Sequence, residues 1–432
     1  MRDDSLIRNI DWVTVLLYAL FITAGWLNIF AVVYDPDPEV KQNIFDLHLN
    51  SGKQLLWIGS AFILILMIFA VDFKFYSAFA YVLYAFIILV LIATIFIGLE
   101  INGSHSWIGI GDFRVQPAEF AKLFTALALS RYLGDVNTKF ERRKTRLTVA
   151  AILLTPCIFI LLQNETGGVL VFSAFILVLF REGLSPWILI IGVASVALFI
   201  FALIFDPLDL ALGILLLAAI IIVIRMLTVR KLKARTMFLS SLIAVGIAFL
   251  CIGFVFSVDF AINHVLKEHQ RNRIMVLVNP EIDKRGQGYQ INQSKVAIGS
   301  GGFAGQGFLQ GTQTKFDFVP EQSTDFIFCT IGEEHGWLGC TVLIVLYILF
   351  LVRLINLAER QKEKFAKLYG YCVASIIFFH FMVNIGMTIG VFPIIGIPLP
   401  FFSYGGSSLW SFTILLFIFL KLDAHRKQVL AH

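Results

Sequence analysis

Charged residues are scarce in this chain: Asp, Glu, Lys and Arg account for 15% of its 432 residues, against about a quarter in soluble domains. Hydrophobic residues account for 58%, and the mean hydropathy is +0.85. A soluble fold has no core large enough to bury so much apolar surface. Composition therefore excludes a soluble globular protein and indicates a protein that crosses a membrane several times.

Cysteine is scarce as well, and none lies in a polar loop. The five cysteines all fall in apolar segments: Cys157, Cys251, Cys329, Cys340 and Cys372. This placement favours neither a disulfide framework nor a thiolate metal site, so we interpret them as packing residues. The net charge of +5 is modest, and nothing in the sequence indicates a nucleic-acid partner.

Nucleotide-binding motifs are absent too. The glycine-rich stretch IGSGGFAGQGF lacks the GxxxxGK[ST] pattern and does not follow a strand and open a helix, as a dinucleotide fingerprint must. We interpret its glycines as sites of close backbone packing. His264 and His269 have no third ligand at metal-site spacing, so no zinc site is predicted.

Long apolar segments dominate the sequence instead. Because about 20 apolar residues cross a bilayer core, the sequence predicts an all-α polytopic fold of about twelve transmembrane helices, the sixth of them short. The predicted ranges are 11–33, 54–71, 76–98, 117–133, 147–163, 168–180, 186–205, 209–225, 236–258, 325–352, 367–392 and 405–421. The first is too long for a signal-peptide core and is interpreted as a retained helix.

Loop charges predict the orientation. Three loops are rich in Lys and Arg: 131–146, 225–235 and 353–367. Because short basic loops stay in the cytoplasm, we expect both termini to be cytoplasmic, the acidic loop 34–53 to be external, and 259–324 to form one large external loop between helices nine and ten. No linker or repeat divides the chain, so we expect a single membrane domain over 1–432 with an inserted helix pair at about 209–258.

The segment RVQPAEFAKLF carries charge at the start of the fourth predicted helix. Pro117 suits a first helical turn, which places Glu119 and Lys122 at i, i+3 on one face. Two interpretations stay open. The residues form a local ion pair, or they line an external cavity that holds a charged substrate, with Arg114 just ahead of them.

A second cluster of charge lies in EHQRNRIMVLVNPEIDKRGQGYQ. Its charged residues around the apolar run include Arg271, Arg273, Glu281, Asp283, Lys284 and Arg285. A solvated loop face is one interpretation. The other is a site in which a carboxylate acts as a general base while cations hold phosphates, and these residues alone do not choose between Glu281 and Asp283.

Two later segments place polar or helix-breaking residues at membrane depth. In PEQSTDFIFCTIGEEHG, Asp325 lies near the external interface and Glu333 lies deeper, where an ionised carboxylate needs a partner. In IGIPLPFFSYGGSS, prolines and glycines break the last two helices. Broken helices at this depth are tolerated where they line a cavity or are buried in protein.

These segments resemble the SEDS family (shape, elongation, division and sporulation proteins). NPEIDKRGQGYQINQSKVAIGSGG, GFLQGTQTKFDFVPEQSTDFIF and GIPLPFFSYGGSS match three family motifs in order and spacing, and RVQPAEFAK and HQRNRI match two more. LQGTQ favours the elongation branch over the division branch. The resemblance covers nearly the whole chain, and it implies a polymerase of peptidoglycan glycan strands that uses lipid II outside the membrane, in cell elongation and shape maintenance.

The resemblance also implies roles for single residues. The essential Asp of the family's large external loop falls on Asp283, the candidate catalytic residue. The candidate substrate-binding residues are Glu119, Lys122, Arg114, Arg271, Arg273, Lys284, Lys295 and Asp325. The chain departs from the family pattern at QNETGG, where Glu165 replaces an Asp, and beside Asp283, where Lys284 and Arg285 replace Pro and an apolar residue.

The implied reaction begins when Asp283 takes the proton of the acceptor sugar's 4-hydroxyl, which attacks the undecaprenyl-linked glycan and releases undecaprenyl pyrophosphate. Preorganised Arg and Lys would stabilise the leaving charge. A divalent cation, Mg or Mn, is the one possible cofactor, although no ligand cluster in the sequence demands it.

The resemblance further implies a class B penicillin-binding protein transpeptidase as partner and the inner (cytoplasmic) membrane of a bacterium as location. Two alternatives stay open. One is a transporter, either a lipid II flippase or another carrier, because a cavity with Glu119 and Lys122 also suits a lipid headgroup. The other is a non-enzymatic scaffold for the penicillin-binding protein.

Overall fold

The structure is a computed structural model of the chain. It describes residues 8–34, 43–101, 103–110, 113–228, 234–266, 271, 274–276, 278–279, 283, 286–315 and 318–426. The chain groups into two compact units, Met1–Leu184 with Gln290–His432, and Ser185–Tyr289. The single membrane domain over 1–432 stays a prediction.

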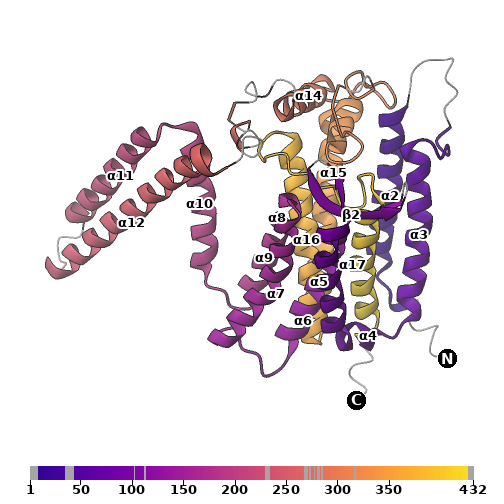
Figure 1. Cartoon of the computed structure of the whole chain (residues 1–432), viewed down its shortest axis with the longest axis horizontal. Helices are drawn as coiled ribbons and strands as arrows, with labels where there is room; N and C mark the ends of the chain where they lie inside the picture. The colour runs from indigo at the N-terminus through magenta and orange to yellow at the C-terminus, as the bar shows by residue number, and fades with distance from the viewer. Residues whose placement is uncertain are drawn as a thin grey trace. The chain divides into compact units, whose positions relative to one another are not determined.

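Helices dominate both units (Figure 1). The first unit contains α2 (Trp12–Val33), α3 (Asn50–Ala70), α4 (Phe73–Ala78), α5 (Ala80–Ile97), α6 (Pro117–Gly134), α7 (Arg143–Leu162), α8 (Thr166–Val171), η1 (Phe172–Ala174), α9 (Phe175–Arg181), α15 (Ile327–Glu359), α16 (Lys364–Thr388) and α17 (Gly406–Ala424). The second contains α10 (Pro186–Ile204), α11 (Pro207–Thr228), α12 (Ala234–Phe260) and the π-helical η2 (Ala261–Val265). Helix α14 (Gln287–Ser300) begins in the second unit and continues in the first.

The predicted apolar segments are all helical in the described residues, and the multi-pass membrane fold is confirmed. Within the described ranges, ten helices are long and apolar enough to cross a membrane. The fourth and sixth predicted segments fall outside this set: α6 carries buried charge, and the sixth is divided into α8, η1 and α9. The count of twelve and the cytoplasmic termini stay predictions. Helix α14 lies within 259–324, the predicted external loop, where no helix was expected.

A small antiparallel sheet joins α5 to α6. Its strands β1 (Leu99–Ile101), β2 (Ser104–Ile110) and β3 (Phe113–Val115) pair in the order β1-β2-β3. Gly103, at φ 79°, forms the turn between the first two strands. Residues alternate between the two faces of a strand, so Ser104 and Ser106 are both buried while His105 between them is exposed. The sequence analysis predicted no strand here.

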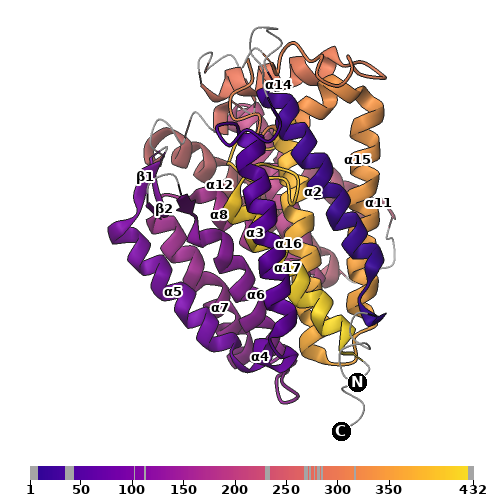
Figure 2. The same cartoon turned by 90° about the vertical axis from the view of Figure 1, so that its right-hand side faces the viewer.

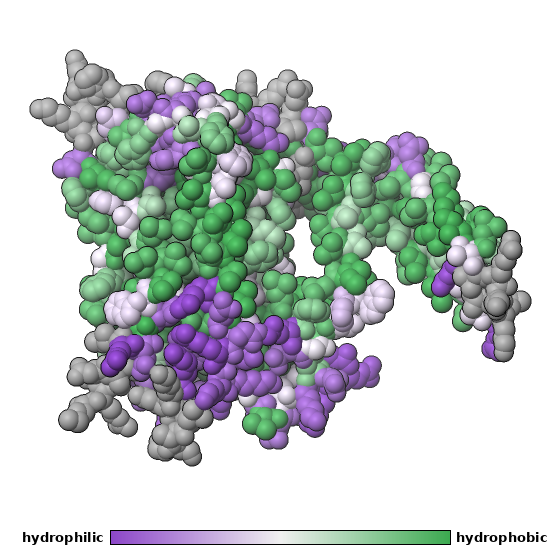
Figure 3. Space-filling model, turned by 180° about the vertical axis from the view of Figure 1, so that it is seen from behind, coloured by the Kyte–Doolittle hydropathy of each residue, from purple (hydrophilic) through white to green (hydrophobic). Residues whose placement is uncertain are grey.

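Helices α16 and α17 form the centre of the first unit (Figure 2). α16 packs against α15, α6, α9 and α17, and α17 packs against α3 and α6. Four of the five cysteines are buried, and all five are free thiols in the structure. The outer helices present apolar side chains outward, and Figure 3 shows the resulting apolar belt between polar ends. Lipid covers such a belt without the cost of exposing it to water.

The predicted break between the last two helices is confirmed. α16 ends at Thr388, and α17 begins only at Gly406. Two hydrogen bonds from the Asn384 side-chain amide of α16 join the irregular segment to the residues just before α15. They reach the carbonyl oxygens of Asp325 and Ile397, each at 2.8 Å. Because these carbonyls are satisfied inside the protein, the chain can leave helical geometry at this depth.

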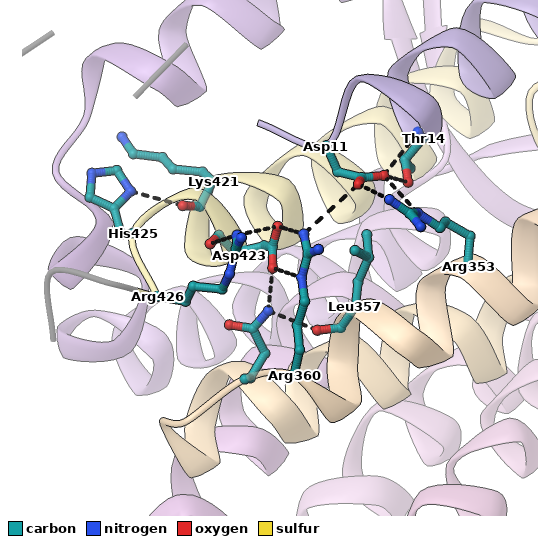
Figure 4. Close-up of polar contacts among 10 residues, drawn as sticks. Asp11, Thr14, Arg353, Leu357, Arg360, Lys421, Asp423, His425 and Arg426 are labelled. Carbon is teal, nitrogen blue, oxygen red and sulfur yellow. Dashed lines mark hydrogen bonds and ion pairs between the residues drawn. The ribbon is translucent and has the colours of Figure 1, made fainter. Parts of the chain in front are cut away.

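Ion pairs fasten the ends of α2, α15 and α17 together (Figure 4). Asp11 accepts two hydrogen bonds from the guanidinium of Arg353. Asp423, which is fully buried, accepts hydrogen bonds from Arg360 and, at 3.2 Å, from Arg426. The start of α2 and the end of α17 therefore lie at the same end of the unit.

Replacing Asp423 by Ala should lower the stability of the protein. The change leaves Arg360 and Arg426 beside a site that has lost its carboxylate. We expect a loss of about 2 kcal/mol, below the value for a fully buried pair because one third of Arg360 is exposed. Thermal unfolding in detergent measures it. Glu141→Ala, at an exposed carboxylate, is the control, and an equal melting temperature for both variants would contradict the assigned role.

Candidate functional site

The Glu119 and Lys122 pair forms as an ion pair on the first turns of α6. The Lys122 ammonium donates to Glu119 Oε1 at 2.9 Å. Pro117 occupies the first turn, and the Ser411 hydroxyl of α17 donates to the Glu119 carbonyl oxygen at 2.7 Å. Lys122 is 2% exposed and Glu119 is 7% exposed. Two opposite charges are held inside the protein, where their interaction is screened much less than at the surface.

His380 of α16 is the second partner of Lys122. Its Nε2 lies 2.8 Å from the Lys122 Nζ, and its Nδ1 lies 3.2 Å from the Pro398 carbonyl oxygen. The imidazole meets the ring of Phe412 edge to face, with centroids 4.7 Å apart. His380 was not predicted from the sequence as a site residue. A lone polar residue in the apolar run IIFFHFMV was the available signal.

Glu165 adds a second carboxylate to this region. Its Oε2 accepts hydrogen bonds from the hydroxyls of Ser104 and Ser106, each at 3.2 Å. Burial raises the pKa of Glu165, and the nearby Glu119 carboxylate adds to the rise although the two serine hydroxyls oppose it. The two serines of β2 reach Glu165 because both point to the inner face of the strand.

Asp325 is the third carboxylate. It lies just before α15, beside Gly396 of the irregular segment. Burial, followed by the charges of Glu321 and Glu165, raises the pKa of Asp325 to about 7. Glu165 thus lies within electrostatic range of Glu119 and Lys122 on one side and of Asp325 on the other.

The raised pKa of Asp325 predicts a pH dependence of stability. Between its ordinary value of 3.8 and its raised value of about 7, the folded protein keeps a proton that the unfolded chain releases. Stability should therefore fall as pH rises through this window and level off above it. Asp325→Asn should remove this contribution, as seen in melting temperatures from pH 5 to pH 8. Asp209→Asn, at an exposed carboxylate, should keep the wild-type slope, and an unchanged slope in Asp325→Asn would contradict the assignment.

Arg114 and Lys295 are both exposed. The Arg114 carbonyl oxygen accepts a hydrogen bond from Ser407 at 3.3 Å, and the same hydroxyl accepts from the Gln116 amide at 3.1 Å, which fixes the start of α6. Lys295 of α14 lies against the backbone of Gly390, where a Cβ would come within 2.7 Å of its Nζ. Their roles in substrate binding stay predictions.

Asp283 lies in the second unit, at the start of α14. Its two carboxylate oxygens accept hydrogen bonds from the backbone amides of Gly286 and Gln287, each at 2.8 Å. A Cβ at Gly286 would come within 2.3 Å of Asp283 Oδ2, so the turn requires glycine for this contact. The carboxylate thus caps the helix and keeps further lone pairs for a ligand. Arg271 is exposed, while Arg273, Lys284, Glu281 and Arg285 lie outside the described residues.

The partners of the Glu333 carboxylate are backbone amides. Its Oε1 accepts from the amides of Thr312 and Gln313, each at 2.7 Å, and its Oε2 accepts from the Thr314 amide at 2.9 Å. The fully buried carboxylate is therefore satisfied and holds the LQGTQ segment against α15. α15 itself is kinked at Gly336, at φ 62°.

No metal site is formed by three or more His, Cys, Asp or Glu side chains within the part of the chain that the structure describes. The divalent cation, Mg or Mn, stays a prediction. The site that the structure does show places Glu119, His380 and Glu165 around Lys122.

Comparison with known proteins assigns the chain to a family. The model of the FtsW, RodA and SpoVE family, described as "Cell cycle protein", matches residues 11–208 and 202–428. The chain belongs to this family.

Several relatives within the FtsW, RodA and SpoVE family are named for an activity. The peptidoglycan glycosyltransferase RodA of Treponema pallidum is 34% identical, covering 87% of this chain and 89% of the relative. The peptidoglycan glycosyltransferase MrdB of Escherichia coli K12 is 31% identical, and the match covers 82% of this chain and 80% of the relative. A chain of the solved structure "Structural coordination of polymerization and crosslinking by a peptidoglycan synthase complex" is 27% identical, with a TM-score of 0.68 and coverage of 97% and 99%.

Proposed function

We propose that this member of the FtsW, RodA and SpoVE family is a peptidoglycan glycosyltransferase that polymerises glycan strands from lipid II, in cell elongation and shape maintenance. The observation that carries the proposal is its similarity, over 80% or more of each chain, to two relatives that are both named peptidoglycan glycosyltransferases. The buried charges of the first unit supply groups that such a substrate requires.

The reaction joins a lipid-linked glycan to lipid II. The Asp283 carboxylate takes the proton of the acceptor 4-hydroxyl, whose oxygen attacks the anomeric carbon of the undecaprenyl-linked glycan. The bond from that carbon to the pyrophosphate oxygen breaks, and undecaprenyl pyrophosphate leaves with the electron pair. Lys122 stabilises the charge that grows on the pyrophosphate, and Arg114, Arg271, Arg273, Lys284 and Lys295 add cations along the substrate.

The partner is a class B penicillin-binding protein transpeptidase, and the location is the inner membrane of a bacterium. Support for the partner comes from the similar chain in a peptidoglycan synthase complex that coordinates polymerization and crosslinking. Support for the location comes from the ten apolar helices, which are long enough to span a bilayer.

Two experiments separate the proposed polymerase from a flippase and from a scaffold. Purified protein is mixed with fluorescently labelled lipid II in detergent, and the products are separated by electrophoresis. Ladders of glycan support the proposed polymerase. Absence of ladders both with and without the partner transpeptidase would overturn it. Movement of labelled lipid II between leaflets of vesicles would then favour a flippase, and its absence would favour a scaffold.

A further inference from the structure

His380 lies between two parts of the site that come from different elements. Its ring is on α16, and its two nitrogens face Lys122 of α6 and the Pro398 carbonyl oxygen of the irregular segment. The residue is 1% exposed. It therefore connects the buried charge pair to the segment between α16 and α17.

The partners determine which nitrogen carries the proton. The Lys122 Nζ lies 2.9 Å from the Glu119 carboxylate, and this adjacent anion favours the ammonium form, which has donors and no acceptor. The 2.8 Å contact between Lys122 Nζ and His380 Nε2 then requires Nε2 to accept. The proton of a neutral imidazole is left on Nδ1, and a carbonyl oxygen, that of Pro398, lies there to accept it at 3.2 Å.

The contact between Lys122 Nζ and His380 Nε2 also limits the direction of the one Lys122 N–H group that neither Glu119 nor His380 accepts. An ammonium has three N–H groups, and Glu119 Oε1 and His380 Nε2 take two of them. Phe412 lies beside the same group, with its ring centroid 5.3 Å from Nζ. Glu119 Oε2 is buried and has no hydrogen-bond partner among the described residues. The Glu119 and Lys122 pair therefore has one N–H donor, on Lys122, and one carboxylate oxygen, Oε2 of Glu119, that remain for a ligand.

We infer that His380 is a positioning residue that acts as a neutral imidazole, protonated on Nδ1, and aims the third N–H of Lys122 at an anionic phosphate oxygen of the lipid-linked substrate. This inference rests on the proposed function for the identity of the substrate. Because the charge on the leaving pyrophosphate grows in the transition state, misdirecting Lys122 affects kcat more than KM.

Two amide variants separate the contact with Lys122 from the contact with Pro398. His380→Gln can place its amide oxygen near the position of Nε2 and accept from Lys122. His380→Asn can place its amide nitrogen near the position of Nδ1 and donate to Pro398, but it does not reach Lys122. We expect kcat for lipid II polymerisation to stay within about threefold of wild type for His380→Gln and to fall about tenfold to a hundredfold for His380→Asn, with a smaller change in KM.

His425→Asn is the matched control. His425 is also a buried histidine, and its Nδ1 lies 2.8 Å from the Lys421 carbonyl oxygen. It follows the C-terminal end of α17, away from Lys122. Its replacement should leave kcat unchanged. If His380→Asn keeps the wild-type kcat, or if both amide variants of His380 lose activity equally, Lys122 is not positioned by Nε2 and the inference is wrong.

A second measurement is independent of activity. In protein labelled with 15N at its eight histidines, the His380 signals are assigned as those that disappear in His380→Gln. We expect the 15N shifts of a neutral ring protonated on Nδ1. An imidazolium, or a ring protonated on Nε2, would overturn the inference whatever the activity. The expected shifts combined with an inactive wild type would support the positioning contact and count against the proposed function instead.

Discussion

Asp283→Asn should reduce lipid II polymerisation by at least about a hundredfold while the protein stays folded. The general base is lost because an amide does not take a proton from the acceptor hydroxyl, and base catalysis contributes about this much or more. Asn caps helices about as well as Asp. It can keep one of the two contacts that Asp283 makes with the Gly286 and Gln287 amides. Initial rates of glycan formation measure the loss.

Melting temperature and a second carboxylate serve as controls for this variant. Asp259→Asn changes a partly exposed carboxylate at the end of α12, which accepts a hydrogen bond from the Asn263 side-chain amide. It should keep the wild-type rate. Asp283→Ala removes the cap as well as the base, so it should lower stability in addition to rate. An Asp283→Asn rate within about tenfold of wild type would contradict the role of general base.

Lys122→Met should lower the polymerisation rate about a hundredfold to a thousandfold, the usual effect of removing one preorganised donor from a developing negative charge. The substitution also leaves the buried Glu119 without its ammonium, which lowers stability. The double variant Glu119→Gln with Lys122→Met removes both charges and should recover stability without recovering the rate. The comparison of initial rates with melting temperatures separates the two effects.

Lys421→Met is the matched control for Lys122. Lys421 is equally buried, at 2% exposed, but it donates to the carbonyl oxygens of Ile68 and Phe69 at the end of α3. Its loss should lower stability and leave the rate of properly folded protein near that of wild type. If Lys421→Met and Lys122→Met reduce the rate equally, the effect of Lys122 is structural and not catalytic.

Features that depend on residues close together in the sequence, such as helix spacing, helix breaks and apolar runs, could be predicted from it. The i, i+3 spacing of Glu119 and Lys122 after Pro117 predicted that both lie on one face of a helix, and an ion pair between them was one of two interpretations left open. The break before Gly406 followed from prolines and glycines that cannot continue a helix. The apolar runs predicted the helices because each must match the thickness of a bilayer.

Contacts between residues far apart in the chain could not be predicted from the sequence. His380 and Lys122 are 258 positions apart, and only the packing of α16 on α6 brings them together. Glu165 was noted as a departure from the family pattern, yet its contacts with Ser104 and Ser106 depend on strand β2, which was not predicted. Glu333 was expected to need a partner, but backbone amides carry no sequence signal that identifies them.

Release of undecaprenyl pyrophosphate tests the central claim most directly. Purified wild-type protein is given lipid II that carries one label in the disaccharide and another in the lipid. The proposed reaction predicts one undecaprenyl pyrophosphate for each glycosidic bond formed, and neither product from Asp283→Asn. Glycan without released lipid pyrophosphate, or release at the wild-type rate from Asp283→Asn, would contradict it.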